Sequence, residues 1–171
     1  MSFLGHVISE ACVEVQEDKV AAVRDWPVPR DLSEVRSFLG LCSYYRRFIA
    51  GFAGIAAPLH WLMRKYVRFH WGPDQDKAFA ELKKRLMTAP ILGMPTDDGA
   101  FIVDSDASST GFGAVLSQVQ NGNEVVLAYA SRSFSRAERN YGIMTLHERS
   151  CRLLYLLSRH SSNMPSEENS L

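Results

Sequence analysis

Hydrophobic positions follow different periods in the two halves of this chain. Between residues 17 and 88, apolar side chains recur every three or four residues, which is typical of amphipathic helices. Between residues 100 and 131, apolar and polar positions alternate, as they do in strands. A shorter alternation over residues 3–9 and 12–15 predicts a β-hairpin at the N-terminus. The pattern therefore predicts an α+β fold in which helices precede a sheet.

Capping residues, glycines and prolines set the expected limits of the helices. A short helix is predicted over residues 17–24, and Trp26-Pro27-Val28-Pro29 then forces an extended connector. Asp31 is a good N-cap, and Glu34 three residues later completes a capping-box pattern. This helix is expected to break near Gly40 or Gly51 and to resume through Ile55 to Met63. A further helix is expected to start at Gly72-Pro73-Asp74 and to end at Thr88-Ala89-Pro90.

The second half reads as a meander of three antiparallel strands. Asn121-Gly122-Asn123 is a strong hairpin signal between two of them. Phe69-His70-Trp71 is expected to be a short structural strand instead of a ligand site. The predicted segments are a boundary at 93–99, strands near 100–106, 112–119 and 124–131, a helix over 145–158, and a polar, disordered tail over 159–171.

Charge is divided unevenly although the net charge is zero. Residues 19–90 hold 13 Lys and Arg against 6 Asp and Glu, and the rest of the chain has the opposite balance. A basic helical half beside an acidic strand half suits a protein that binds phosphates and holds metal nearby, although charge alone favours an ordinary solvated surface. Three scattered cysteines form no metal spacing, and a reducing, intracellular setting is the simplest expectation. No apolar run approaches membrane-spanning length, so no membrane partner is expected.

Asp104 and Asp106 are the most informative pair of polar residues. They stand at i and i+2 of an apolar strand, so both side chains lie on one face just before a turn. Acidic pairs in this setting commonly hold a hard divalent metal. The competing explanation is a polar strand end before a hairpin turn.

A series of short motifs narrows the choice. In order along the chain, they are Phe3-Leu4-Gly5-His6, Trp26-Pro27-Val28-Pro29, Arg36-Ser37-Phe38-Leu39-Gly40, Tyr44-Tyr45-Arg46-Arg47-Phe48, Ala57-Pro58-Leu59, Phe69-His70-Trp71, Ala89-Pro90-Ile91-Leu92, Asp106-Ala107-Ser108, Ala128-Tyr129-Ala130-Ser131-Arg132 and Ala137-Glu138-Arg139-Asn140-Tyr141. Each motif is weak by itself, whereas the whole series in this order resembles the Pol polyprotein of gypsy-type LTR retrotransposons.

This resemblance implies a domain order. Residues 1–16 would be the end of the reverse transcriptase palm, 17–92 a helical thumb/connector, 93–158 part of a ribonuclease H-like domain and 159–171 a disordered tail. The ribonuclease H-like part would be truncated to a three-stranded antiparallel meander plus one helix. The rest of a Pol polyprotein is an implied partner.

The resemblance also implies catalytic and metal-binding residues. Asp106 matches the first ribonuclease H carboxylate, and Glu148 in Thr145-Leu146-His147-Glu148 fits the second, so both would bind Mg²⁺. Asp104 is interpreted as a neighbour of the site instead of a ligand. The family pattern stops after Glu148, as a frameshift, a misjoined exon or a decayed copy would make it. The chain also has no Tyr-x-Asp-Asp polymerase motif. We therefore expect no catalysis by the chain alone.

Nucleic-acid contacts are expected from the helical half. Tyr44, Arg46, Arg47, Lys83 and Lys84 are the candidates for binding an RNA–DNA hybrid or duplex DNA. The alternative for residues 44–49 is that Tyr45, Phe48 and Ile49 are core and the arginines are solvated. We expect both to hold, with the aromatic residues mostly core and Arg46 and Arg47 mostly at the surface. For the whole chain, the alternative function is a non-enzymatic nucleic-acid-binding or interaction module, or a non-functional relic.

Overall fold

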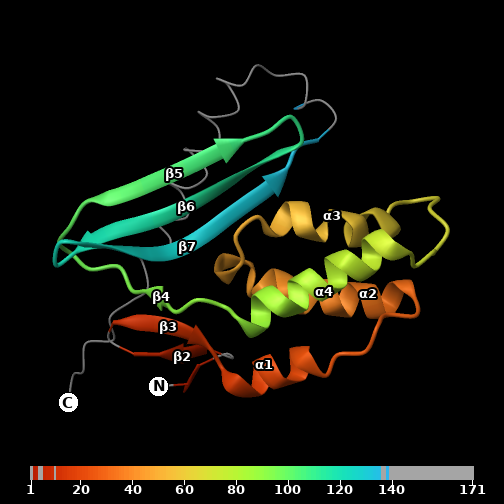
Figure 1. Ribbon diagram of the computed structural model, residues 1–171, viewed down its shortest axis with the longest axis horizontal. Helices are drawn as coiled ribbons and strands as arrows, with labels where there is room; N and C mark the ends of the chain where they lie inside the picture. The colour runs from red at the N-terminus through yellow and green to blue at the C-terminus, as the bar shows by residue number, and fades with distance from the viewer. Residues whose placement is uncertain (1, 4–5, 10, 136–137, 139–171) are drawn as a thin grey trace, which may run out of the picture.

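Two antiparallel sheets lie one above the other on one side of the molecule, and the helices lie beside them (Figure 1). The computed structural model describes residues 2–3, 6–9, 11–135 and 138. Their elements, in chain order, are β1 (Ser2–Phe3), β2 (His6–Ile8), β3 (Cys12–Val15), α1 (Glu17–Arg24), α2 (Leu32–Tyr44), the 3-10 helix η1 (Arg46–Phe48), α3 (Phe52–Leu62), α4 (Pro73–Met87), β4 (Leu92–Gly93), β5 (Phe101–Ala107), β6 (Gly111–Gln120) and β7 (Asn123–Ser133).

The first sheet contains the predicted N-terminal hairpin. Strand β2 pairs antiparallel with β3, which confirms that prediction. Strand β4 then pairs with β3, so the chain returns to this sheet after the last helix. Gly93 of β4 has no room for a side chain, because an added Cβ would lie 2.3 Å from Cγ1 of Val125 on β7. The first sheet therefore lies directly against the second.

Local capping explains where two helices begin. The Asp31 carboxylate accepts a hydrogen bond from Glu34 N at 2.9 Å, as predicted for the start of α2. Gly51 precedes α3 with φ at +68°, a left-handed conformation that glycine adopts without a Cβ clash. The predicted break therefore lies at Gly51. Gly40 lies inside α2, so that alternative is wrong.

Helix α4 starts at Pro73 and ends at Met87, close to the predicted limits. The segment before it, Phe69 to Trp71, is not a strand, which corrects that expectation. Side-chain contacts hold this segment in place, instead of backbone hydrogen bonds to a neighbouring strand. The Trp71 indole Nε1 donates to Asp76 Oδ1 at 2.6 Å, and the Phe69 and Trp71 rings pack against the core.

A single large core joins the first sheet to the helices. Its buried members come from β3, β4, η1 and the helices α1 to α4, and include Phe38, Phe48, Leu59, Leu82 and Leu92. Val126 and Tyr129 of β7 pack against the same cluster, so the helical half supports one edge of the second sheet. Within the described part of the chain, no helix is long and apolar enough to cross a membrane.

The second sheet has the predicted order β5-β6-β7. Asn121 and Gly122 form its tight turn with φ at +51° and +80°, the conformation that a two-residue hairpin requires. A register shift between Leu116 and Ser117 leaves Leu127 of β7 without a partner in β6. The α+β prediction is confirmed, whereas the predicted helix over 145–158 and the tail over 159–171 lie outside the described residues.

A buried amide holds the segment between the two sheets. The Gln118 side chain is fully buried, and its Oε1 accepts from Thr96 N at 2.9 Å. Its Nε2 donates to Thr96 O at 2.9 Å and to Asp98 O at 3.1 Å. The polar segment predicted as a boundary is therefore tied to β6 by side-chain hydrogen bonds, although the limits of the domains stay a prediction.

Candidate nucleic-acid interface at the junction of helices and sheet

Two adjacent arginines join the helical half to strand β7. Arg46 Nη2 donates to Ser131 O at 2.8 Å, and Arg47 Nη2 donates to Leu127 O at 3.2 Å. The Ser131 hydroxyl also accepts from Ala53 N in α3 at 2.9 Å. In this order β7 is an outer strand of the sheet, and Leu127 has no partner in β6. The arginines therefore satisfy edge groups that the sheet leaves open.

The surroundings of the two guanidinium groups differ. Arg46 stays exposed, with its guanidinium carbon 6.0 Å from the Phe52 ring centroid. Arg47 is half-buried over the Phe48 ring, and burial lowers the pKa of its guanidinium. The expectation of solvated arginines is therefore wrong for Arg47. Their predicted contact with nucleic acid stays a prediction.

Aromatic contacts hold the same segment from the other side. The His6 ring stacks on Tyr44 at 5.3 Å and on Phe48 at 5.6 Å between ring centroids. Burial lowers the pKa of His6, and the charge of Arg47 lowers it further. Tyr44 remains about half exposed, whereas Tyr45 is buried. Tyr45 and Phe48 are thus core residues as expected, whereas Tyr44 is exposed.

The two predicted lysines of α4 lie in different places. Lys83 is half-buried, donates from Nζ to Trp26 O at 2.9 Å and lies over the Phe79 ring. Lys84 is exposed and lines a cavity between α4 and β7. Lys84 is therefore the better placed of the two for an external anion.

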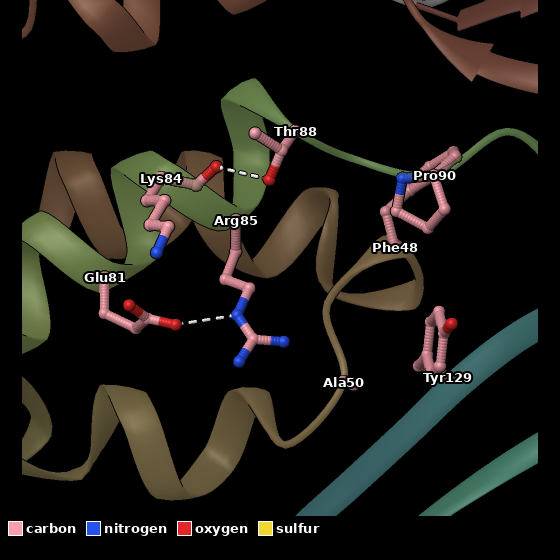
Figure 2. A pocket seen from close by; sticks show the side chains of 8 residues that line it. All are labelled: Phe48, Ala50, Glu81, Lys84, Arg85, Thr88, Pro90 and Tyr129. Carbon is pink, nitrogen blue, oxygen red and sulfur yellow. Dashed lines mark hydrogen bonds and ion pairs between the residues drawn. The ribbon is translucent and has the colours of Figure 1, made fainter.

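This cavity has a volume of about 290 Å³ and a mixed basic and aromatic lining (Figure 2). Arg85 extends from α4 into the space beside the strand that carries Tyr129. Its Nε donates to Glu81 Oε1 at 2.7 Å, and this hydrogen bond lowers the pKa of the Glu81 carboxyl. The complete lining is Phe48, Ala50, Glu81, Lys84, Arg85, Thr88, Pro90 and Tyr129.

A second cavity, of about 330 Å³, contains the acidic pair. Asp104 and Asp106 are both exposed, and their partners in β6 are Val115 and Gly113. Ala50 and Tyr129 line this cavity as well as the basic one, so the two adjoin. The geometry thus brings a basic and an acidic surface together at the junction.

Carboxylate oxygens are ligands that Mg²⁺ accepts, so Asp106 fits that metal in kind. Asp104 lies beside it on the same face, as the sequence indicated. Among the described residues, no three His, Cys, Asp or Glu side chains converge as a metal site would require. Glu148, the other predicted ligand, lies outside those residues.

Sequence reasoning missed the residues that complete the junction. Tyr129 and Ser131 stand in a quoted motif, and Arg85 directly follows the candidates Lys83 and Lys84, but neither pattern showed that strand and helix meet here. The unpaired position of Leu127 comes from a register shift that no local residue signal predicts.

Several known proteins are similar to this chain in sequence. Residues 71–152 match the family described as an RNase H-like domain found in reverse transcriptase. The chain is 37% identical over 140 residues to a retrovirus-related Pol polyprotein from transposon 412 of Drosophila melanogaster, covering 82% of this chain and 11% of that protein. It is 32% identical over 144 residues to the transposon Tf2-3 polyprotein of Schizosaccharomyces pombe, covering 84% of this chain and 11% of that protein. The chain thus spans about a tenth of the length of these curated relatives.

A solved structure has the same fold. The foamy viral protease-reverse transcriptase in complex with an RNA/DNA hybrid matches 96% of this chain and 23% of its own, with a TM-score of 0.78 and 22% identity. Together with the order β5-β6-β7, these matches confirm the resemblance found in the sequence. Residues 71–152 are therefore similar to the RNase H-like domains found in reverse transcriptase, and the relatives named above are transposon polyproteins.

Proposed function

We propose that this chain is the part of a retrotransposon reverse transcriptase where a nucleic-acid duplex passes from the thumb to the ribonuclease H-like domain. It binds RNA–DNA hybrid or duplex DNA without sequence preference. The observation that carries the proposal is the adjoining pair of cavities, one basic and one acidic, that share Ala50 and Tyr129. In this arrangement the basic cavity can bind the phosphate backbone close to the carboxylates of the acidic cavity.

Binding of this kind depends on salt, because cations that contact phosphates release condensed counterions. Titration of a fluorescently labelled RNA–DNA hybrid at several salt concentrations tests the proposal. We expect affinity to fall steeply as salt rises, with a similar result for duplexes of unrelated sequence. Absence of binding at low salt, or binding that ignores salt, contradicts the proposal.

Cleavage needs more than this chain supplies by itself. Asp106 and Glu148 are the proposed Mg²⁺ ligands, and two-metal hydrolysis needs several converging carboxylates to fix both ions. Mg²⁺ gives up its hydration water reluctantly, so one or two carboxylates hold it weakly.

Incubation of the purified chain with an end-labelled RNA–DNA hybrid and Mg²⁺ or Mn²⁺ tests the catalytic statement. We expect no cleavage and no primer extension. Cleavage that disappears in Asp106→Asn would overturn it, and would show that the chain, alone or by self-association, builds a working site. The same assay separates an enzyme from a module that only binds nucleic acid.

A further inference from the structure

The basic cavity between α4 and β7 is built for an anion of one charge. Lys84 and Arg85 bring two positive charges to its lining, and Glu81 brings one negative charge. The hydrogen bond from Arg85 keeps the pKa of Glu81 low, so this carboxylate is ionised at neutral pH. The cavity therefore has a net charge of one positive unit, which matches a phosphodiester better than a doubly charged terminal phosphate.

The donors of Arg85 are divided between the protein and the cavity. Its Nε is used by Glu81, whereas Nη1 and Nη2 have no hydrogen-bond partner among the described residues. The two terminal nitrogens of a guanidinium match the geometry of two phosphate oxygens. Glu81 thus fixes the orientation of the Arg85 fork and leaves its outer edge to a ligand (Figure 2).

The size and the aromatic part of the lining indicate more than a lone phosphate. About 290 Å³ exceeds the space that one phosphate group needs, and Tyr129 and Pro90 border it. Aromatic faces stack on bases or sugars with little regard to sequence. Tyr129 therefore suits the nucleoside unit that adjoins the phosphate.

The position of Tyr129 connects this cavity to the acidic one. Asp104 pairs with Val115, and Val115 pairs with Tyr129, so the carboxylate and the ring lie in one row across the sheet. Neighbouring strands are about 4.8 Å apart, which places the two residues roughly 10 Å from each other. A strand bound beside Lys84 and Arg85 can thus continue over Tyr129 toward the cavity of Asp104 and Asp106.

From this geometry we propose that the cavity of Lys84, Arg85 and Tyr129 is a subsite for one phosphodiester of a nucleic-acid strand and its adjoining nucleoside. Lys84 and Arg85 pair with the phosphate, Glu81 orients Arg85, and Tyr129 contacts the nucleoside. The subsite fixes the path of the strand toward Asp106. This inference rests on the proposed duplex binding.

Charge-matched variants of the full chain test the subsite with a labelled RNA–DNA hybrid. Lys84→Gln is compared with Lys77→Gln, which removes the same charge from an exposed position of the same helix. We expect the slope of log affinity against log salt to fall by about one for Lys84→Gln, because one phosphate contact is lost, and to change little for Lys77→Gln. Equal slopes for the two variants would overturn the subsite.

A variant with the opposite sign sharpens the test. Glu81→Gln keeps an oxygen that can accept from Arg85 Nε but removes the negative charge from the cavity, so it should tighten binding several-fold. Asp74→Asn makes the same charge change in the first turn of α4, away from the cavity. An equal gain in both variants contradicts the subsite and indicates only a general charge effect. If the unmodified chain fails to bind at low salt, the proposed function fails and the subsite fails with it. If the unmodified chain binds and the paired variants behave alike, only the subsite fails.

Discussion

Arg46-Arg47 and Lys84-Arg85 are two pairs of adjacent cations in the same basic half of the chain, but they have different surroundings. The first pair donates to backbone carbonyls of β7, while the second faces an open cavity. The difference comes from what each pair faces: Arg46 and Arg47 lie beside the unpaired carbonyls of an outer strand, whereas Lys84 and Arg85 lie beside open space. Local charge therefore shows that a surface is basic, but not which of its cations remain available to a ligand.

The largest expected difference between the pairs is in stability. Arg46→Ala with Arg47→Ala leaves two edge carbonyls of β7 without their charged donors, which costs about 3 kcal/mol in the free energy of unfolding. Lys84→Ala with Arg85→Ala removes exposed groups and should change that free energy by less than about 1 kcal/mol. Urea denaturation measures both double variants.

Arg36→Ala is the control for the first pair, because Arg36 is an exposed arginine on α2. It should match the unmodified chain. Equal urea midpoints for the two double variants would show that the arginine contacts do not hold the sheet to the helices.

Gln118→Leu tests a contact that, unlike the arginine contacts with β7, involves no charged group. The substitution leaves the backbone groups of Thr96 and Asp98 without their buried amide partner, so we expect a loss of about 2 kcal/mol. Gln120→Leu removes the donor to Met94 O and to Gln118 Oε1 but leaves the Gln118 amide paired with the backbone of Thr96 and Asp98, so it should cost less. If both variants unfold at the same urea concentration, the buried amide does not specifically hold this segment.

The smallest expected effect is a pH dependence of stability, and it arises from His6 beside Arg47. The pKa of His6 is lowered in the folded protein, so the unfolded chain binds the proton more readily. Stability is therefore complete above the ordinary histidine pKa of about 6.5 and falls as the pH drops through that value toward the folded pKa. A proton on His6 also places a second positive charge close to Arg47.

Thermal unfolding between pH 7.5 and pH 5 measures this dependence. His6→Phe keeps a ring against Tyr44 and Phe48 and should flatten the curve. The pKa of His60 is lowered by burial alone, so comparison with His60→Phe separates the effect of the Arg47 charge on His6 from the effect of burial. A curve of unchanged steepness in His6→Phe would contradict the assignment to His6.

The sequence predicted features that depend on a few neighbouring residues. The helix start at Asp31, the turn at Asn121-Gly122 and the shared face of Asp104 and Asp106 all follow from local geometry. The sequence also offered either Gly40 or Gly51 as the helix break, because both are glycines. Only the structure shows that Gly51 is the one with a positive φ. The partners of Arg46 and Arg47 lie 85 and 80 residues away, a separation that no periodicity reports.

The occupied edge of β7 also determines the direction in which the second sheet can grow. A strand that joined the sheet at β7 would have to displace the guanidinium groups from the carbonyls of Leu127 and Ser131. Of the two outer strands in the order β5-β6-β7, only β5 lies away from these arginines. Any added strand, from this chain or another, is therefore directed to the flank of β5, where its residues would lie next to Asp104 and Asp106.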